Sequence, residues 1–594
     1  MNKNILLTAA VAALTFVPAD AQDLNPTVEI LNAFEAKLVE SSKPDIRMDI
    51  PDSLMKFDLE FDYSVFSTGY SGGYDFSPYL MDMRPAADSY RGGKFYLKAG
   101  AGYTPNPVFD LVYSPLHKGS FKLDIYASNN SYIGSYRNIG AVRKDASDDY
   151  VSLLHVTDKA AQASSGVSGY TDGYDFSSAA GVNLRYDHSR FAAVLGAGWK
   201  GLNGRTMWAN TNYNILDVNA GVYAKSSSRK YFHYDASVRF RYGVDDIAPA
   251  GGHYSTVGLN QLDVAATLGP VMGESSVLVD VGASLANYSN LFGGQVIRTF
   301  VAPKYIFEKK GVRIALGLKL STVKRDGDAF DGALHHGKKS QVLYPDIHAS
   351  FNIMRDYLNV YASVTGGETL NTYPDMKEKY HFFNPYYGRG VAPAMDNSIE
   401  RFNARIGLRG NVASLVRFGL SAGFATYANG LVETVYAAGA ADGIPAGLLP
   451  GVSWQDYSLA YAEASLCYDR KPVFADARVR WDNVIAKAGT PGFSPAKLTG
   501  MLRLGYNHND RIRVSVYGDF ALARNGSIVS LEDGSCIAGR IPGFVDLGLH
   551  AEYAMNRRFS IFANVGNILN STVQRDALYA ENGINATAGV VLNF

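Results

Sequence analysis

The chain has 594 residues with 56 basic and 56 acidic side chains, so its formal net charge is zero. This balance argues against a nucleic-acid-binding protein, because such proteins carry a basic surface that meets the phosphates. The two cysteines, Cys467 and Cys536, are too few for a disulfide framework or a cysteine-based metal site.

The beginning of the chain has the three parts of a secretory signal peptide. Lys3 supplies the positive charge, residues 5–17 are apolar, and residues 19–21 read A-D-A, a cleavage signature before Gln22. The apolar run is shorter than the ~20 residues that cross a bilayer as a helix, and no later run approaches that length. We therefore expect residues 1–21 to be a signal peptide and the mature chain to be exported without a helical anchor.

Residues 22–93 form a short segment ahead of the strand-rich part. Pro26 favours a short helix after it, although an extended chain fits nearly as well. Residues 57–66 alternate as a strand does, and the Gly, Tyr and Pro content of residues 69–85 predicts an irregular loop. The pattern fits a plug-like position in a lumen or a periplasmic position, and does not decide between them.

From Lys94 to Phe594 the sequence predicts an all-β fold, a transmembrane antiparallel β-barrel of about 22 strands. Apolar side chains alternate with polar or small ones along each clear strand, as in residues 234–242, 312–321, 401–409 and 544–553. The 39 tyrosines and 59 glycines suit the interfacial aromatic girdles and the turns of such a barrel. Alternation in a soluble sandwich would come with shorter strands, of about 5 to 6 residues.

Connection lengths support the same architecture. Tight polar turns are predicted near residues 187–190, 226–230, 308–311, 355–356, 411–414, 469–472, 507–510 and 555–558. Longer connections are predicted between them, at residues 201–212, 325–339, 371–397, 429–453 and 524–540. Short periplasmic turns that alternate with long extracellular loops are typical of outer-membrane barrels, so both ends of the barrel domain are expected in the periplasm.

Five arginines fall on the predicted lumen face: Arg239, Arg241, Arg401, Arg405 and Arg409. They would either draw anionic solutes or pair across the lumen wall with Asp235, Asp346, Asp519 and Asp546. The run from Asp326 to Gly332 resembles the spacing of a calcium loop but lacks its closing glutamate, and His335 and His336 are expected in a solvated loop. No catalytic, cofactor-binding or metal-binding residue is therefore predicted, and no cofactor.

The closing run from Gly543 to Phe594 resembles the end of the barrel domain of TonB-dependent outer-membrane receptors of the Bacteroidota type. Residues 567–570 read N-I-L-N, which stands where the penultimate strand of that family carries a similar element, and Phe594 provides the terminal aromatic residue. The resemblance implies a barrel of about 22 strands with a plug before it and the energy-transducing partner TonB. Residues 22–93 are too short for that plug and hold no TonB-binding stretch beyond a faint match at residues 27–30, which argues against TonB coupling.

We expect a protein of the cell outer membrane that contacts lipid and is not an enzyme. The first expected function is transport or binding of a solute by a TonB-receptor-like barrel. The alternative is a non-transporting barrel subunit or scaffold of a larger outer-membrane complex, with outer-membrane or periplasmic protein partners. A lumen of this width would leak unless it is filled by the N-terminal segment, by folded loops or by a partner.

Overall fold

The structure of the chain is a computed structural model that describes residues 94–143, 149–157, 168–207, 209–225, 231–249, 255–330, 343–354, 357–380, 383–385, 387–388, 393–412, 415–441, 444–445, 447–486 and 492–594. The predicted signal peptide and residues 22–93 lie outside the described residues, so the expectations for them stay predictions. The first described strand begins at Phe95.

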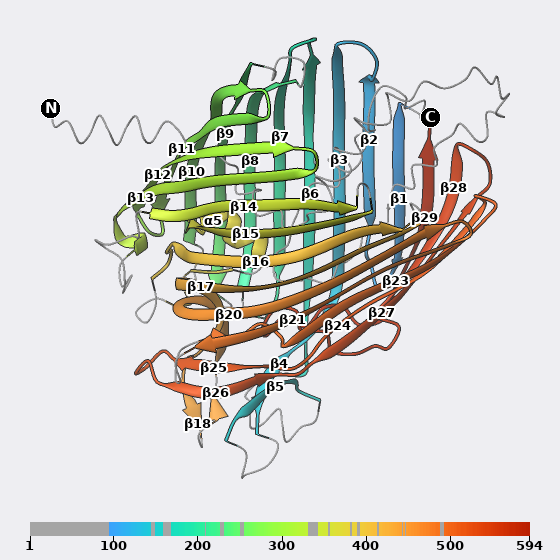
Figure 1. Cartoon of the computed structure of the whole chain (residues 1–594). Helices are drawn as coiled ribbons and strands as arrows, with labels where there is room; N and C mark the ends of the chain where they lie inside the picture. Colours follow the sequence, from blue (N-terminus) through green and yellow to red (C-terminus); the bar gives the residue numbers. More distant parts are fainter. Residues whose placement is uncertain are drawn as a thin grey trace.

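The chain forms a closed antiparallel barrel of 22 strands, as the sequence predicts. Its strands are β1 (Phe95–Tyr103), β2 (Val108–Leu116), β3 (Phe121–Arg137), β6 (Tyr170–Asp187), β7 (Phe191–Arg205), β8 (Ala209–Ala224), β9 (Phe232–Pro249), β10 (Ser255–Met272), β11 (Ser275–Asn290), β12 (Gly294–Lys309), β13 (Val312–Asp326), β14 (Leu343–Met354), β15 (Leu358–Thr369), β16 (Ser398–Val412), β17 (Val416–Ala437), β20 (Leu448–Arg470), β21 (Val473–Ala486), β23 (Leu498–His508), β24 (Ile512–Ala521), β27 (Phe544–Ala554), β28 (Phe559–Gly566) and β29 (Asn585–Asn593). Pairing of β1 with β29 closes the ring, with Tyr96 opposite Asn593. Figure 1 shows the strands of the near wall crossing those of the far wall, as tilted strands of a barrel do.

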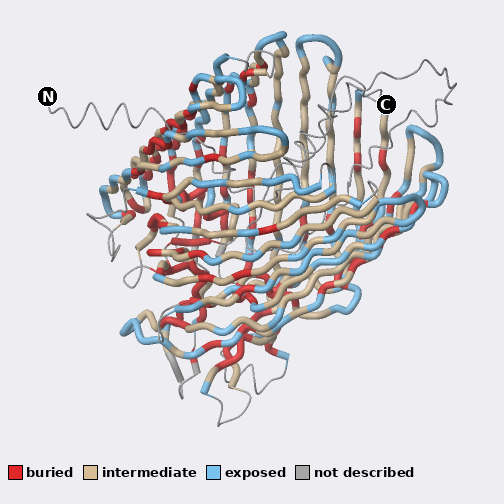
Figure 2. Tube along the Cα trace, in the orientation of Figure 1, coloured by how far each residue is buried: buried red, intermediate tan, exposed pale blue. Residues whose placement is uncertain are grey.

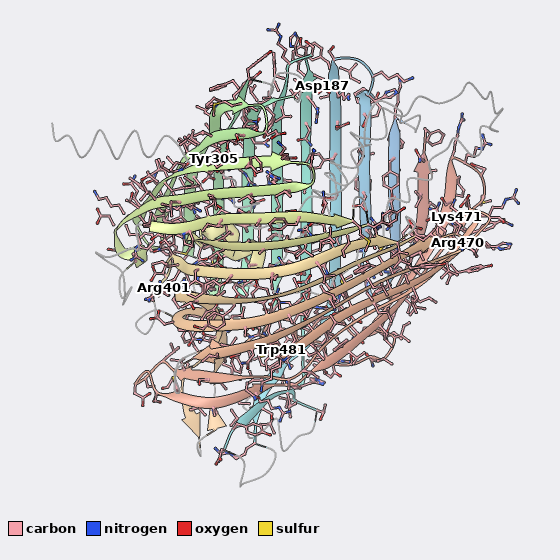
Figure 3. All side chains as sticks on the ribbon, viewed as in Figure 1. Asp187, Tyr305, Arg401, Arg470, Lys471 and Trp481 are labelled. Atoms are coloured by element: carbon pink, nitrogen blue, oxygen red, sulfur yellow. The ribbon has the colours of Figure 1, made fainter. Side chains whose placement is uncertain are left out.

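The outer face of the wall is apolar, and the predicted alternation explains why. On β13, Leu316 is 52% exposed whereas its neighbour Ala315, on the lumen face, is 7% exposed. Tyr305 and Trp481, labelled in Figure 3, are likewise exposed large side chains of the wall. Every strand of the ring finds both hydrogen-bonding neighbours, so its backbone is satisfied without water, which is the condition for a strand to cross lipid. Among the described residues, no helix is long and apolar enough to span a membrane.

The two ends of the barrel differ as predicted. Short turns join strands at one end, for example residues 509–511 between β23 and β24 and residues 555–558 between β27 and β28. Figure 3 places Asp187, Arg470 and Lys471 at this end. The strand ends joined by longer connections, such as those of β13 and β14 and of β15 and β16, lie at the other end. We assign the short-turn end to the periplasm and the long-loop end to the outside.

Two of the predicted long connections are wrong, because strands continue through them. β7 runs to Arg205 and β8 begins at Ala209, so the connection expected at residues 201–212 is a tight turn. Likewise β17 extends to Ala437 and β20 begins at Leu448, inside the connection expected at residues 429–453. These strands rise beyond the ~25 Å apolar band that a barrel needs.

The alternation reverses where the wall rises above that band. On β8, Leu216 points outward and is 44% exposed, but Tyr213 and Ile215, on the inward face, are 1% and 4% exposed. Asn212 and Asn214 point outward on the same stretch. The outer face there meets water instead of lipid, and the inner face meets a folded loop instead of a wet lumen. The reversal made a strand look like a connection in the sequence.

The wall has an uneven height, and additional strands extend it on one side. β17 and β20 have 22 and 23 residues, whereas β28 and β29 have 8 and 9. The extension consists of β4 (Ile139–Val142), β5 (Val151–His155), β22 (Gly492–Phe493), β25 (Arg524–Ser530) and β26 (Cys536–Ile541), with parallel pairing of β25 to β17 and of β26 to β5. β18 (Ala440–Ala441) and β19 (Ile444–Pro445) form a separate small pair. Figure 1 shows this group at the extracellular end, and Figure 2 shows buried residues in it and along the neighbouring edge of the wall.

Aromatic rings cover glycines of neighbouring strands on the lumen face. A Cβ at Gly407 or at Gly423 would lie 2.4 Å from the ring of Tyr361 or of Tyr461, respectively. Only a residue without a side chain lets the ring lie on the backbone this closely, which explains part of the high glycine and tyrosine content.

Candidate functional site: the lumenal loops at the barrel mouth

Residues 370–397, here called the first lumenal loop, connect β15 to β16 and carry the helix α5 (Tyr373–Lys379). Pro374 stands in the first turn of this helix, where its missing N–H costs nothing. The helix contacts the wall opposite the strands from which the loop starts, because Glu378 pairs with Lys200 of β7 at 3.1 Å. The loop therefore reaches across the lumen, and Figure 1 shows α5 behind the strands of the near wall.

A buried polar cluster fixes α5 to the far wall. The ammonium of Lys377 lies 2.9 Å from the Asp245 carboxylate of β9 and donates to the Thr211 hydroxyl at 2.7 Å. Both charged side chains of this pair are 0% exposed. The Tyr373 hydroxyl donates to the same carboxylate oxygen that the ammonium approaches, Asp245 Oδ2, at 2.7 Å. Because the pair is fully enclosed and each group is hydrogen-bonded, removing one partner would leave a buried charge.

Apolar packing surrounds this cluster. Tyr373, Met376 and Phe383 of the loop pack in one buried core with wall residues that include Tyr213 and Ile247. This core lies on the inward apolar stretches of β8, β9 and β10, where the alternation is reversed. Burial of this kind contributes roughly 1.5–3 kcal/mol for each fully buried large side chain.

The C-terminal end of the first lumenal loop is fixed separately. Asp396 forms an ion pair with Arg325 of β13, and both side chains are nearly fully buried. The Asn371 amide donates to the Asp396 carbonyl at 3.1 Å, and the Asn429 amide donates to the Asn397 carbonyl at 2.7 Å. Both ends of the loop are thus held at the wall, which leaves the helix between two fixed points.

Residues 567–584, the second lumenal loop, connect β28 to β29 and fold inward around one arginine. The Arg575 guanidinium, 2% exposed, donates to Asp519 of β24 at 2.8 Å and to Asp546 of β27 at 2.9 Å. It also forms an ion pair with Glu581 of the loop itself. Burial lowers the pKa of Arg575, but the three carboxylates together outweigh this and raise the pKa above its ordinary value, so the guanidinium stays charged.

The N-I-L-N element begins the second lumenal loop and shapes it. Asn567 adopts a φ of 45°, in the left-handed region where asparagine is tolerated. Its side-chain oxygen accepts from the Ser571 amide at 3.0 Å, and its side-chain nitrogen donates to the Asn582 carbonyl at 3.0 Å. Ile568 and Leu569 between the asparagines are exposed on the outside. This element therefore turns the chain inward at the barrel rim.

Glu433 of β17 is a further point at which the second lumenal loop is held. Glu433 pairs with Arg524 of β25 and accepts from the Ala577 amide of the second loop. Burial lowers the pKa of Lys379, at the end of α5, and the charges of Glu433 and Asp576 partly offset this.

Comparison with solved structures shows the same barrel elsewhere. The FrpB iron transporter of Neisseria meningitidis matches with a TM-score of 0.60 at 12% identity, over 85% of this chain and 81% of that one. The pyoverdine outer-membrane receptor FpvA of Pseudomonas aeruginosa matches with a TM-score of 0.57 at 12% identity, over 85% of this chain and 79% of that one. The siderophore receptor PirA of Acinetobacter baumannii matches with a TM-score of 0.57 at 10% identity, over 84% of this chain and 80% of that one.

The barrel has the fold of TonB-dependent receptors. The resemblance seen in the closing run of the sequence is thereby confirmed for the fold. No protein-family model matches the chain. No curated protein matches it either. With its apolar exterior and closed ring, this receptor-like barrel is a protein of the outer membrane.

Within this TonB-receptor-like barrel, the five predicted lumenal arginines have different surroundings. Arg239 pairs with Asp217, and Arg241 pairs with Asp375 of α5 at 3.0 Å, so their expected aspartate partners are wrong. Asp519 and Asp546 instead hold Arg575, as described above. Arg409 lies over the Tyr361 ring with 4.2 Å to its centre, and Arg405 donates to the Ser421 hydroxyl at 2.9 Å. Arg401 is exposed at a bulge of β16.

The remaining sequence candidates are not brought together into a site. Residues 328–330 form a short 3-10 helix, and Asp331, Gly332, His335 and His336 lie outside the described residues. No group of three or more histidine, cysteine or acidic side chains that could hold a metal is found in the described part of the chain. Cys467 lies in a strand and Cys536 is exposed in β26, both as free thiols.

Sequence reasoning missed Lys377, Arg575, Glu433 and Asp576. Three of them lie in loops, where the sequence does not alternate as a strand does. Glu433 lies on β17, in the part that the sequence predicts as a connection. One signal was present: Lys377 sits in a short helix pattern opened by Pro374, inside a loop too long for a simple connection.

Proposed function

We infer that this barrel is an outer-membrane receptor that binds a solute at its extracellular mouth and admits it through a lumen gated by the two lumenal loops. The observation that carries this proposal is the attachment of both loops to the inner wall by buried ion pairs, Lys377 with Asp245 and Arg575 with Asp546. Solved structures with the same fold bear the names of iron transporters and siderophore receptors, which supports a solute as the cargo.

The loops are held by side-chain ion pairs, hydrogen bonds and apolar packing, and this kind of attachment can serve a gate. The first lumenal loop is held at α5 and at Asp396, and the second at Arg575 and Asn567. Each contact can break without unpairing a strand of the ring, because none of them is part of a strand ladder. A bound solute that competes for these groups would favour the open arrangement.

The proposal is tested by swelling of liposomes that contain the purified full-length protein. We expect slow entry of small sugars into liposomes with the natural chain, and faster entry when Lys377→Met and Arg575→Met are combined. Fast entry with the natural chain, or no change in the double variant, would contradict a loop-gated lumen. In that case, stoichiometric copurification of another protein after gentle solubilisation would support the scaffold function instead.

A further inference from the structure

Two cationic side chains of the lumen wall lie against one aromatic ring. The Arg298 guanidinium of β12 and the Lys319 ammonium of β13 are 4.9 Å and 4.4 Å from the centre of the Phe300 ring. Phe300 lies opposite Ser321 of β13, so Arg298 is on the mouth side of the ring and Lys319 on the periplasmic side. Two like charges that share one ring repel each other, and an anion beside both would stabilise the arrangement.

Both cations keep hydrogen-bond donors that can reach a ligand. Arg298 donates from Nη1 to the Glu368 carbonyl at 2.6 Å, which is a neutral acceptor. In the part of the chain that the structure describes, neither cation has an ion-pair partner, and no hydrogen bond is found for Arg298 Nη2 or Lys319 Nζ. Neither of these two atoms is fully buried. They can therefore donate to a molecule in the lumen.

The strands around Lys319 hold its ammonium in place. β12, β13, β14 and β15 are successive neighbours in the wall (Figure 1). The Lys319 side chain crosses β14, because its Nζ lies only 2.9 Å from the position that a Cβ on Gly367 of β15 would take. The missing side chain at Gly367 gives the ammonium its room. Residues of β12, β13 and β15 thus shape one cationic place on the lumen face.

Acidic side chains of the neighbouring strands limit which anion this place can take. Three of them are paired with other groups: Asp263 with Arg241, Asp280 with Lys304, and Asp346 with His348. Glu368 of β15 accepts from the Ser321 hydroxyl at 3.2 Å, and Glu400 of β16 accepts from the Tyr427 hydroxyl at 2.8 Å. Among the described residues, neither glutamate is within ion-pair distance of a cation. Their charges would repel a dianion about twice as strongly as a monoanion.

The cationic place lies beside both fixed ends of the first lumenal loop. Glu368, whose carbonyl accepts from Arg298, stands on β15 just before that loop. Arg325, which pairs with Asp396 at the other end of the loop, is on the same face of β13 as Lys319. A ligand that takes the Arg298 guanidinium therefore competes with a contact at the foot of the loop.

We propose that Arg298 and Lys319 bind the carboxylate of a monoanionic solute in the lumen, next to the ends of the first lumenal loop. A carboxylate has two oxygens, and each can accept a charge-assisted hydrogen bond from one of the two cations. Its single charge meets less repulsion from Glu368 and Glu400 than sulfate or a phosphate dianion would. This assignment rests on the proposed receptor function, because it names a chemical class for the solute of that receptor.

The test is calorimetric titration of the full-length protein in detergent with propionate, propionamide and sulfate. Propionamide has nearly the shape of propionate without its charge, and sulfate carries two charges. We expect propionate to bind at least tenfold more tightly than either. The titration is repeated with the Lys377→Met and Arg575→Met double variant, so that closed loops do not limit access. No binding of propionate to either protein, or equally tight binding of propionamide or sulfate, would overturn the proposal.

Variants of the wall show whether the two cations make the site. Arg298→Met and Lys319→Met should each weaken propionate binding about tenfold or more, because each removes a hydrogen bond from a charged donor. Lys319→Arg keeps the charge and should keep most of the binding. Arg313→Met removes a cation from the same face of β13, nearer its periplasmic turn, and is the matched control that should change nothing.

The acid beside the site gives an independent check. Glu368→Gln removes a repelling charge, so both anions should bind more tightly and sulfate should gain more than propionate. Unchanged propionate binding in Arg298→Met or Lys319→Met, or an equal loss in Arg313→Met, would contradict the assignment. Heat-modifiable mobility on gels shows whether each variant keeps the barrel.

The outcomes separate this inference from the receptor function. If the loop variants open the lumen to sugars but propionate does not bind, the carboxylate site is wrong and the gated receptor stands. If propionate binds and depends on Arg298 and Lys319 but the natural lumen is already open, the site stands and the gate is wrong.

Discussion

Replacing Lys377 by methionine tests the buried attachment of α5 most directly. Methionine keeps most of the length of the side chain and removes the ammonium that lies between Asp245 and the Thr211 hydroxyl. Asp245 would keep its hydrogen bonds from Thr211 and Tyr373 but lose its only cation among the described residues. Since both side chains of the ion pair are 0% exposed, water cannot replace the missing charge without entry into the core.

The size of the effect follows from this enclosure. Removal of one partner from a buried ion pair costs about 3–5 kcal/mol. At about 1.4 kcal/mol for each factor of ten, the ratio of attached to detached loop should fall by a factor of about 100 to a few thousand. The barrel ladder does not depend on α5, so we expect detachment of residues 370–397 without unfolding of the barrel.

The assay is single-channel conductance in planar bilayers, together with limited proteolysis of the first lumenal loop. Lys377→Met should show longer open periods and faster cleavage within residues 370–397 than the natural chain. Lys118→Met, an exposed lysine at the periplasmic end, is the control and should change neither. Addition of Asp245→Asn should restore part of the attachment, because the buried charge is then gone as well. Unchanged conductance and cleavage in Lys377→Met would refute the reasoning.

Three further predictions concern the wall and the second loop. Leu316→Arg should lower the free energy of unfolding in urea by about 2–4 kcal/mol, because it places a charge in lipid. The control His348→Arg, on the exposed lumen face, should leave this free energy unchanged. Gly423→Ala should cost about 1–3 kcal/mol in the same assay, because its Cβ would lie 2.4 Å from the Tyr461 ring, while Gly293→Ala, which meets no atom within 4 Å, should be near neutral. Asn567→Ala should speed proteolysis of residues 567–584, since three hydrogen bonds of about 1 kcal/mol each are lost.

The strands that cross lipid were predictable because lipid imposes a simple pattern on them. Leu316 and Ala315 lie on the expected faces, and the closing strands up to Asn593 pair as the sequence suggests. Above the membrane the same geometry holds, but the chemical meaning of the two faces changes. Tyr213 and Ile215 point inward there and Asn214 outward, so the pattern no longer matched a transmembrane strand.

The loop attachments could not be predicted from spacing, since they join distant parts of the chain. Tyr373 and Asp245 are 128 positions apart, and Arg524 and Glu433 are 91 positions apart. The strand period places Asp245 on the inner face but does not tell which cation reaches it. The expectation that lumenal arginines pair across the wall failed for this reason: the partner of Asp519 and Asp546 is Arg575, which comes from a loop.

Both lumenal loops are attached to the wall through buried ion pairs. Each loop supplies one buried cation, Lys377 or Arg575, to carboxylates of the wall. The first loop also supplies the buried Asp396 carboxylate to Arg325 of the wall. Salt in the medium screens exposed ion pairs but acts little on enclosed ones, so ionic strength alone is a poor signal for opening. A solute that enters the mouth and competes for the groups that hold the loops acts where salt does not. The gate is therefore suited to respond to the chemistry of a bound molecule and to stay closed in media of changing salinity.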